Sequence, residues 1–185
     1  MTNEIPLFHS LDEQTLVGFT GRINVLDRTS HQMLGVVVLR EGQVYRCQYR
    51  GAIGLKAFYN AVIEGAQLVP QEFIVEPEII EEKDRQIHYP YSVLKNKTED
   101  VLKRFQAVSG KRPPDHVKLI AKPAFLEAQS EVSEAEFQVL CALSEWSTVK
   151  DLYQHCSLLD YEITEALVSL RQQEALSVVA PRTGR

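Results

Sequence analysis

The sequence has few cysteines and no long run of apolar residues. Its three cysteines, Cys47, Cys141 and Cys156, form no C-x-x-C pair, so neither a zinc site nor a disulfide framework is expected. Each lies within an apolar pattern, which predicts three reduced, packed thiols. No apolar run reaches the roughly 18 residues of a membrane span, and the N-terminal segment MTNEIPLFHS lacks the features of a secretory signal. We therefore expect a cytoplasmic protein without a membrane span.

The sequence also lacks the patterns that carry catalysis. Its five histidines are scattered without metal-ligand spacing, and no G-x-S-x-G, H-E-x-x-H or paired Cys/His motif occurs. The G-x-x-G segment from Gly51 to Gly54 has no P-loop lysine and indicates a tight turn between a strand and a helix. The sequence thus predicts a protein that is not an enzyme, with no catalytic residue, cofactor or metal site.

The stretch from Gly35 to Gly65 organises the first half of the chain. An apolar, β-branched run at 36–39 and an alternating run at 44–50 flank the polar segment 40–43, whose Gly42 favours a hairpin turn. Alternation places Arg46, Gln48 and Arg50 on one face of the second strand. Helical spacing then takes over from 52 to 64, and Gly65 is predicted as its C-cap.

Further elements are predicted on both sides of this stretch. The S-x-x-E pattern at Ser10 indicates a short helix from Leu11. Strands are expected at 18–26 and 68–76, and a helix at 92–109 before Gly110 and two prolines. Together these elements predict an α+β domain at 11–108, with a small antiparallel sheet and a packed helix.

The last third of the chain predicts three short helices and a strand. A capping box at Ser133 begins the first helix, Ser147 or Thr148 caps a second at 149–155, and Asp160 caps a third at 161–173. A short strand at 175–180 follows. This order is that of a winged-helix domain, predicted at 131–181. The segment 109–130 is predicted as a basic, proline-containing linker, within which 119–126 is either a short strand or a docking segment.

The spacing of several residues in the first domain resembles that of the PATAN family, a bacterial signalling domain often found beside response-regulator receivers. The matching residues are Gly35, Gly42, Gly51, Gly54, Ala57, Phe58, Phe73, Glu76 and Pro77. The resemblance covers roughly 17–77. It implies a non-enzymatic module that binds other proteins in two-component, motility or polarity circuits, with a response regulator or a polarity protein as the partner.

Charge is distributed unevenly along the chain. From Glu131 onward there are four basic and nine acidic residues, whereas 95–122 holds eight basic and three acidic ones. The basic segment is interpreted either as a solvated linker or as a surface for an anionic partner. Glu162 and Glu165 stand near the start of the third helix, where a DNA-binding winged helix needs cations, so the sequence argues against DNA binding.

Arg46 and Arg50 have the R-x-x-x-R spacing of cyclic-dinucleotide-binding PilZ domains, but the D/N-x-S-x-x-G element of those domains does not follow. We interpret Arg46, Gln48 and Arg50 as candidate partner-binding residues, because arginine is enriched at protein interfaces. The predicted function is a signalling or scaffold adaptor, with a homodimer as one arrangement. The alternatives are a transcription regulator that binds DNA through the winged helix, and a nucleotide-sensing module that uses the two arginines.

Overall fold

The computed structural model describes residues 5–67, 69–128 and 131–179. The chain folds into two compact units, Met1–Lys103 and Arg104–Arg185. The boundary between them lies inside one helix, α3 (Tyr91–Val108), whereas the sequence placed it after residue 108. Residues 180 and 181, at the predicted end of the second domain, lie outside the described residues. None of the described helices is long and apolar enough to cross a membrane.

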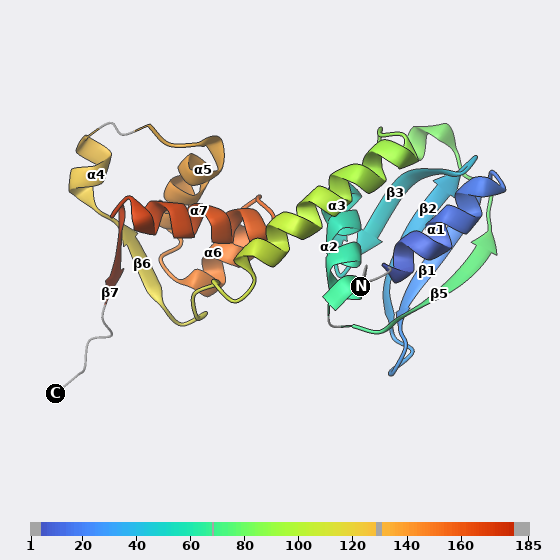
Figure 1. Cartoon of the computed structure of the whole chain (residues 1–185), viewed down its shortest axis with the longest axis horizontal. Coiled ribbons are helices and arrows are strands. Elements are labelled where there is room, and N and C mark those ends of the chain that lie inside the picture. Colours follow the sequence, from blue (N-terminus) through green and yellow to red (C-terminus); the bar gives the residue numbers. More distant parts are fainter. Residues whose placement is uncertain (1–4, 68, 129–130, 180–185) are drawn as a thin grey trace. The chain divides into compact units, whose positions relative to one another are not determined.

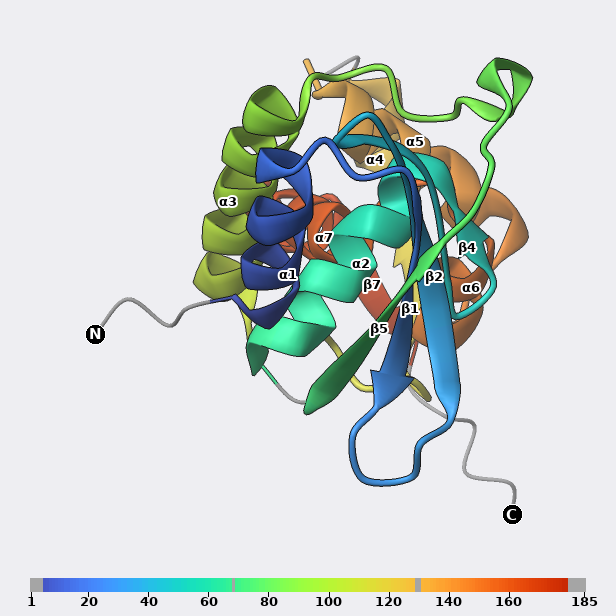
Figure 2. The ribbon, with the colours of Figure 1, turned by 90° about the vertical axis from the view of Figure 1, so that its right-hand side faces the viewer.

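The first unit is an α+β fold, as predicted, built on a five-stranded antiparallel sheet in the order β4-β3-β2-β1-β5. Its elements run in chain order through α1 (Pro6–Leu16), β1 (Gly21–Asp27), β2 (Met33–Arg40), β3 (Gln43–Tyr49), β4 (Ala52–Ile53), α2 (Gly54–Gln67), β5 (Gln71–Pro77), the 3-10 turn η1 (Glu82–Asp84) and α3. Figures 1 and 2 show α1 and α2 on the same face of this sheet.

The inner face of the sheet forms the core under these helices. Ile23, Val37 and Leu39 are fully buried there, and α2 contributes Phe58 and Val62 from its apolar stripe. Removing such side chains from water stabilises the fold by about 1.5–3 kcal/mol each. Alternation along the strands sends the next side chains to the opposite face, and α1 and α2 leave that face uncovered.

The predicted hairpin between β2 and β3 is confirmed. Glu41 and Gly42 form its turn with φ of 52° and 73°, the left-handed region that a two-residue hairpin requires. A Cβ added at Gly42 would lie 2.8 Å from the Thr15 carbonyl oxygen. The same turn accepts a hydrogen bond from Thr15, whose hydroxyl donates to the Gly42 carbonyl at 2.9 Å. The hairpin turn is thus fixed against the end of α1.

Two predicted details around this core are wrong. Ala52–Ile53 is not the first turn of a helix but strand β4, because Arg50 and Gly51, with φ of 45° and 82°, turn the chain back onto β3. Gly65 is not a C-cap, since α2 continues to Gln67; a Cβ at Gly65 would collide with the Gln71 side chain at 2.3 Å.

The first helix also begins earlier than predicted. α1 starts at Pro6, whose restricted φ suits the first helical position, so Ser10 lies inside the helix and caps nothing. Its Asp12 joins α1 to α3. The carboxylate accepts hydrogen bonds from the Tyr91 hydroxyl and the Lys95 ammonium, both at 2.7 Å. Burial opposes ionisation of Asp12, but these two hydrogen bonds outweigh it and lower the pKa of Asp12 below 3.8.

The second unit contains the predicted series of three helices and a strand, preceded by a further strand and a short helix. It consists of β6 (Lys118–Ala121), α4 (Pro123–Glu127), α5 (Glu134–Glu145), α6 (Val149–His155), α7 (Asp160–Gln172) and β7 (Leu176–Val179). β6 and β7 pair as an antiparallel sheet (Figure 1). The segment predicted as a linker therefore supplies a strand and the short helix α4, and it belongs to this unit.

Local signals set the helix starts in this unit. Ser133 and Glu136 form the predicted capping box, with the Ser133 N–H donating to the Glu136 carboxylate at 2.6 Å. Thr148, rather than Ser147, caps α6. Asp160 is not the cap of α7: the helix starts at this residue, and the Glu162 carboxylate accepts a hydrogen bond from the Leu159 N–H at 3.0 Å.

One of the three cysteines is not packed as predicted. Cys47 and Cys156 are buried, and burial raises the pKa of Cys47 to about 12. Cys141 is exposed, because helix α5 turns Val139 and Leu143 toward the core and leaves Cys141 and Phe137 outside. The apolar pattern of α5 is broader than the stripe that the core of the unit accepts.

We expect Gly42→Ala to lower the free energy of unfolding by more than Gly18→Ala. Both glycines have positive φ, which costs about 1 kcal/mol for a residue with a Cβ. Only at Gly42 does a Cβ also meet backbone, whereas the space around Gly18 is open. Urea unfolding of the full chain measures the difference, and equal losses at the two positions would contradict the packing of the turn against α1.

A second prediction concerns pH. Because the folded pKa of Asp12 is lowered, its stabilisation is fully present above the ordinary pKa of 3.8 and is lost as pH falls through the folded value. Asp12→Asn should therefore cost about 1 kcal/mol at neutral pH and progressively less in acid. Urea unfolding across this range tests it. A difference in free energy of unfolding between the two proteins that stays constant into acid would show that the Asp12 charge contributes nothing.

Candidate functional site

The outer face of the five-stranded sheet presents a continuous row of side chains. The strand register aligns Ile53 with Gln48, Gln48 with Val36, Val36 with Asn24, and Asn24 with Ile74, so the row crosses all strands from β4 to β5. We call Ile53, Gln48, Val36, Asn24 and Ile74 the outer row. Its two ends are apolar and open, with Ile53 65 % and Ile74 44 % exposed.

A second row, next to it, carries Glu76, Arg22, Val38 and Arg46, and its charged side chains have partners. Arg22 donates to the Glu76 carboxylate at 2.7 Å, and the Asn24 amide donates to the same oxygen at 2.7 Å. The hydrogen bond from Arg22 is the main cause of the lowered pKa of Glu76. Arg46 lies 3.7 Å from Asp84. The outer row is therefore bordered by charges that already have partners at the sheet surface.

The segment between β5 and α3 covers one end of this face, as Figure 2 shows. Ile80 packs with Val38 and Tyr45 in a small apolar cluster, and the backbone N–H groups of Gln86 and Ile87 donate to the Tyr45 carbonyl. Tyr45 can face outward because a bulge interrupts the register between β2 and β3. Val36 of the outer row packs against this cluster, and Asn24 beside it is only 8 % exposed, whereas Ile53, Gln48 and Ile74 stay accessible.

The structure separates the two arginines of the R-x-x-x-R pattern. Arg50 lies in the turn after β3 rather than in the strand, and its Nε donates to the Glu64 carboxylate of α2 at 2.8 Å. Tyr49 donates to the same carboxylate at 2.9 Å. Burial is the first cause that raises the pKa of Tyr49 to about 12, and the hydrogen bond to Glu64 is the second. Arg46 contacts Asp84 instead. Each guanidinium is thus held by a different carboxylate, and only Arg46 and the exposed Gln48 belong to the outer face.

The other residues of the glycine-rich pattern have structural positions. Ala57 and Phe58 are buried in the core, and Phe73 is half-buried on β5. At Gly35, a Cβ would lie 2.3 Å from the Gln48 carbonyl oxygen of the neighbouring strand. Gly51 and Gly54, both with positive φ, shape the entry and exit of β4. The pattern thus builds the edge of the sheet that presents Ile53 and Gln48.

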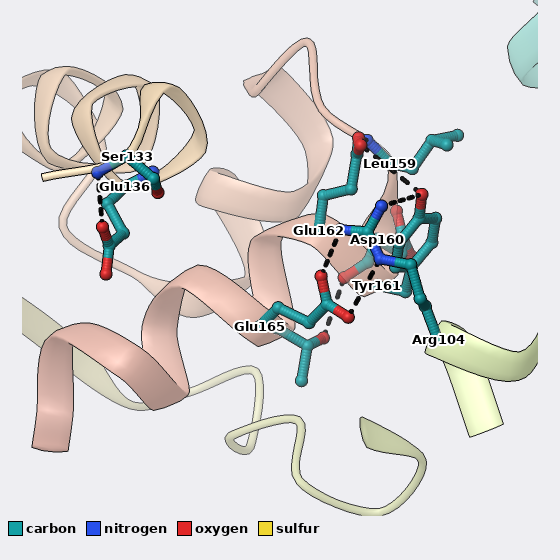
Figure 3. A network of polar contacts seen from close by, with 9 residues as sticks. Arg104, Ser133, Glu136, Leu159, Asp160, Tyr161, Glu162 and Glu165 are labelled. Carbon is teal, nitrogen blue, oxygen red and sulfur yellow. Dashed lines mark hydrogen bonds and ion pairs between the residues drawn. The ribbon is translucent and has the colours of Figure 1, made fainter. Parts of the chain in front are cut away.

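In the second unit, a polar network surrounds the N-terminal half of α7 (Figure 3). Arg104 binds Glu165 through two hydrogen bonds, at 2.6 Å from Nη2 and 3.3 Å from Nε. Its guanidinium lies 4.9 Å from the centre of the Tyr161 ring. The hydrogen bond to the Glu165 carboxylate raises the pKa of Arg104. Beside this network lies a groove of about 660 Å³ whose lining includes Glu134, Glu136, Glu162 and Glu165.

Two carboxylates on this acidic side make structural hydrogen bonds. Glu136 is buried, and burial opposes its ionisation, but hydrogen bonds from Ser169 and Ser133 outweigh it and lower the pKa of Glu136. Glu162 satisfies the Leu159 N–H at the start of α7. Within the residues that the structure describes, no group of three or more His, Cys, Asp or Glu side chains is arranged to hold a metal ion.

No protein-family model, no curated protein and no solved structure matches the chain.

The sequence did not reveal the outer row as a set. The sequence singles out Gln48 with Arg46 but predicts a helix at Ile53, and Asn24 and Ile74 belong to strands far apart in the chain. The pattern Glu-x-Ile-x-Glu at 72–76 was a usable signal, because it places an apolar side chain between two carboxylates on one face of a strand. Only the register shows that this side chain ends the same row as Ile53.

We expect the Arg104–Glu165 pair to contribute about 0.5–1 kcal/mol of coupling energy, since its two hydrogen bonds are only partly exposed to water. A double-mutant cycle of Arg104→Gln and Glu165→Gln, followed by urea unfolding, measures it. The matched control is Lys103–Asp100, an exposed pair of α3 at 3.3 Å, for which we expect coupling near zero. Equal coupling in both cycles would contradict a specific role for Arg104.

Proposed function

We propose that this protein is a non-enzymatic adaptor that binds another protein through the outer face of the sheet in its first unit. The observation that carries the proposal is the outer row. It combines exposed isoleucines at both ends with the amide of Gln48, and Arg46 lies beside it. Protein interfaces typically bury exposed apolar side chains together with arginine and polar groups.

The charges around the outer row support a protein ligand rather than a nucleotide. A nucleotide phosphate needs cations free to bind it, whereas Arg22 is held by Glu76 and Arg46 lies beside Asp84. A protein surface can instead bury the isoleucines and leave these ion pairs in place at the rim. Protein binding therefore costs less desolvation here than binding of a highly charged small molecule.

The resemblance to the PATAN family gives the proposal its context. It suggests a bacterial signalling module, cytoplasmic, whose partner belongs to a two-component, motility or polarity circuit. A response-regulator receiver or a polarity protein is the partner class that we propose on this basis. The residues of the resemblance lie in β2, in α2, in β5 and in the turns before and after β3, which together build and support the outer row.

The test is capture of partners from native lysate by the full chain, followed by reconstitution of each captured complex from purified proteins. Ile53→Asp/Ile74→Asp should weaken the reconstituted complex at least about tenfold, because two apolar anchors become charged in a desolvated interface. Ile79→Asp is the matched control: this isoleucine is 93 % exposed in the same unit and lies outside the outer row. Titration calorimetry measures both affinities.

Two results would overturn the proposal. One is a reconstituted complex whose affinity is the same for the double variant as for the unaltered chain. The other is self-association: a dimer that the double variant dissociates in sedimentation experiments would assign the outer row to a contact between copies of this chain.

A further inference from the structure

The basic segment before β6 lies along a groove of the second unit. This groove, of about 830 Å³, runs beside the C-terminal half of α7 and along β7, the elements drawn in red in Figure 1. Leu119, Leu167, Val168, Leu176 and Val178 supply its apolar lining. Val178 is 69 % exposed, so part of this lining is in contact with water. We call it the α7–β7 groove.

The charged side chains of this groove are all cations. Lys111, Arg112 and Arg171 line it, and no aspartate or glutamate does among the described residues. Arg112 is partly neutralised, since it lies 2.9 Å from Asp115 and 3.5 Å from Asp160 and stacks over the Tyr153 ring. Lys111 and Arg171 make no ion pair with any described residue. The groove thus keeps two uncompensated positive charges in a chain whose net charge is −5.

The wall that carries Lys111 and Arg112 is attached to the body of the unit. The Val117 carbonyl accepts a hydrogen bond from the Val149 N–H at 2.9 Å, and the Asp115 carbonyl accepts one from the Lys150 N–H at 3.1 Å. The Leu119 N–H donates to the Ser147 carbonyl at 2.8 Å. These backbone bonds hold the segment beside the start of α6, so the groove is a formed surface of the unit.

We propose that the α7–β7 groove binds an acidic, apolar segment of a partner protein. Apolar side chains of the segment fill the lining between α7 and β7, and its carboxylates pair with Lys111 and Arg171. The residues 180–185 of this chain have the wrong charge for this role, since they include Arg182 and Arg185 and no acidic side chain. The proposal concerns a second surface and does not depend on the outer row.

The shape and charge of the groove favour a peptide over DNA. A winged helix that reads DNA needs cations along its third helix, whereas the N-terminal half of α7 carries Asp160, Glu162 and Glu165. Its one arginine, Arg171, comes in the last turn, beside the apolar lining. Phosphate groups gain nothing from that lining, but leucine or phenylalanine side chains do.

The test uses fluorescence anisotropy on the full chain, with a labelled peptide that alternates glutamate with leucine and phenylalanine. We expect Lys111→Glu/Arg171→Glu to weaken binding roughly tenfold, because two attractions become repulsions. Lys150→Glu is the matched control, an exposed lysine of α6 outside the groove, and should leave binding unchanged. A peptide with serine in place of leucine and phenylalanine should bind at least roughly tenfold more weakly.

Three results would overturn the proposal: unchanged peptide binding in the double variant, equal binding of the serine peptide, or binding of duplex DNA that the double variant abolishes while the peptide does not bind. If the double reversal fails to fold, Lys111→Gln/Arg171→Gln removes the charges without adding carboxylates. Ile53→Asp/Ile74→Asp should not change peptide binding. The groove and the outer row can therefore fail or succeed independently.

Discussion

The register of the antiparallel pairing in the first sheet is the constraint on which the rest of that unit depends. A slip by one residue would exchange the two faces of every strand and place Ile23 and Val37 in water. The register is secured at the β2–β3 hairpin, where Gly42 takes a backbone conformation that few residues adopt and also contacts the end of α1. Everything that the outer face presents follows from this alignment.

A comparable role in the second unit falls to the pairing of β6 with β7. It brings a segment from before the three helices beside the strand that comes after them. A bridge between Lys118 and Thr148 attaches β6 on its other side. The pairing thereby carries the basic segment to the C-terminal end of α7. The acidic residues at the start of α7 and the basic segment before β6 therefore border different sides of α7.

Local signals predicted much of the fold. The β2–β3 hairpin, the Ser133 capping box and the approximate spans of α3 and α6 depend on residues close together in sequence, and Gly42, Ser133 and Pro114 reveal them. β4 escaped prediction because Ala52 and Ile53 fit a helical period as well as a strand, and only the turn at Arg50 decides between them. Tyr45 departs from the expected alternation of β3 because of a bulge. Phe137 departs from the expected apolar stripe of α5, because the core accepts only a narrow stripe of that helix.

The candidate sites were harder to predict than the fold, because each consists of residues from distant segments. Gln48 and Arg46 were identified from their own strand, but Ile74 joins them only through two further strands. Lys111 belongs to the basic segment 95–122, one interpretation of which is a surface for an anionic partner, whereas Arg171 lies in the third helix of the second unit, and nothing local relates one to the other. Their common groove exists because β6 pairs with β7, a contact between residues more than 50 positions apart.

The unequal burial of the cysteines has a practical consequence. Two of the thiols are shielded, and the Cys47 thiol also resists ionisation, so a maleimide or similar reagent at neutral pH should modify Cys141 first. The natural chain therefore carries a single attachment point for a fluorophore or spin label, on α5 of the second unit. A probe there can report on that unit in solution without any substitution in the protein.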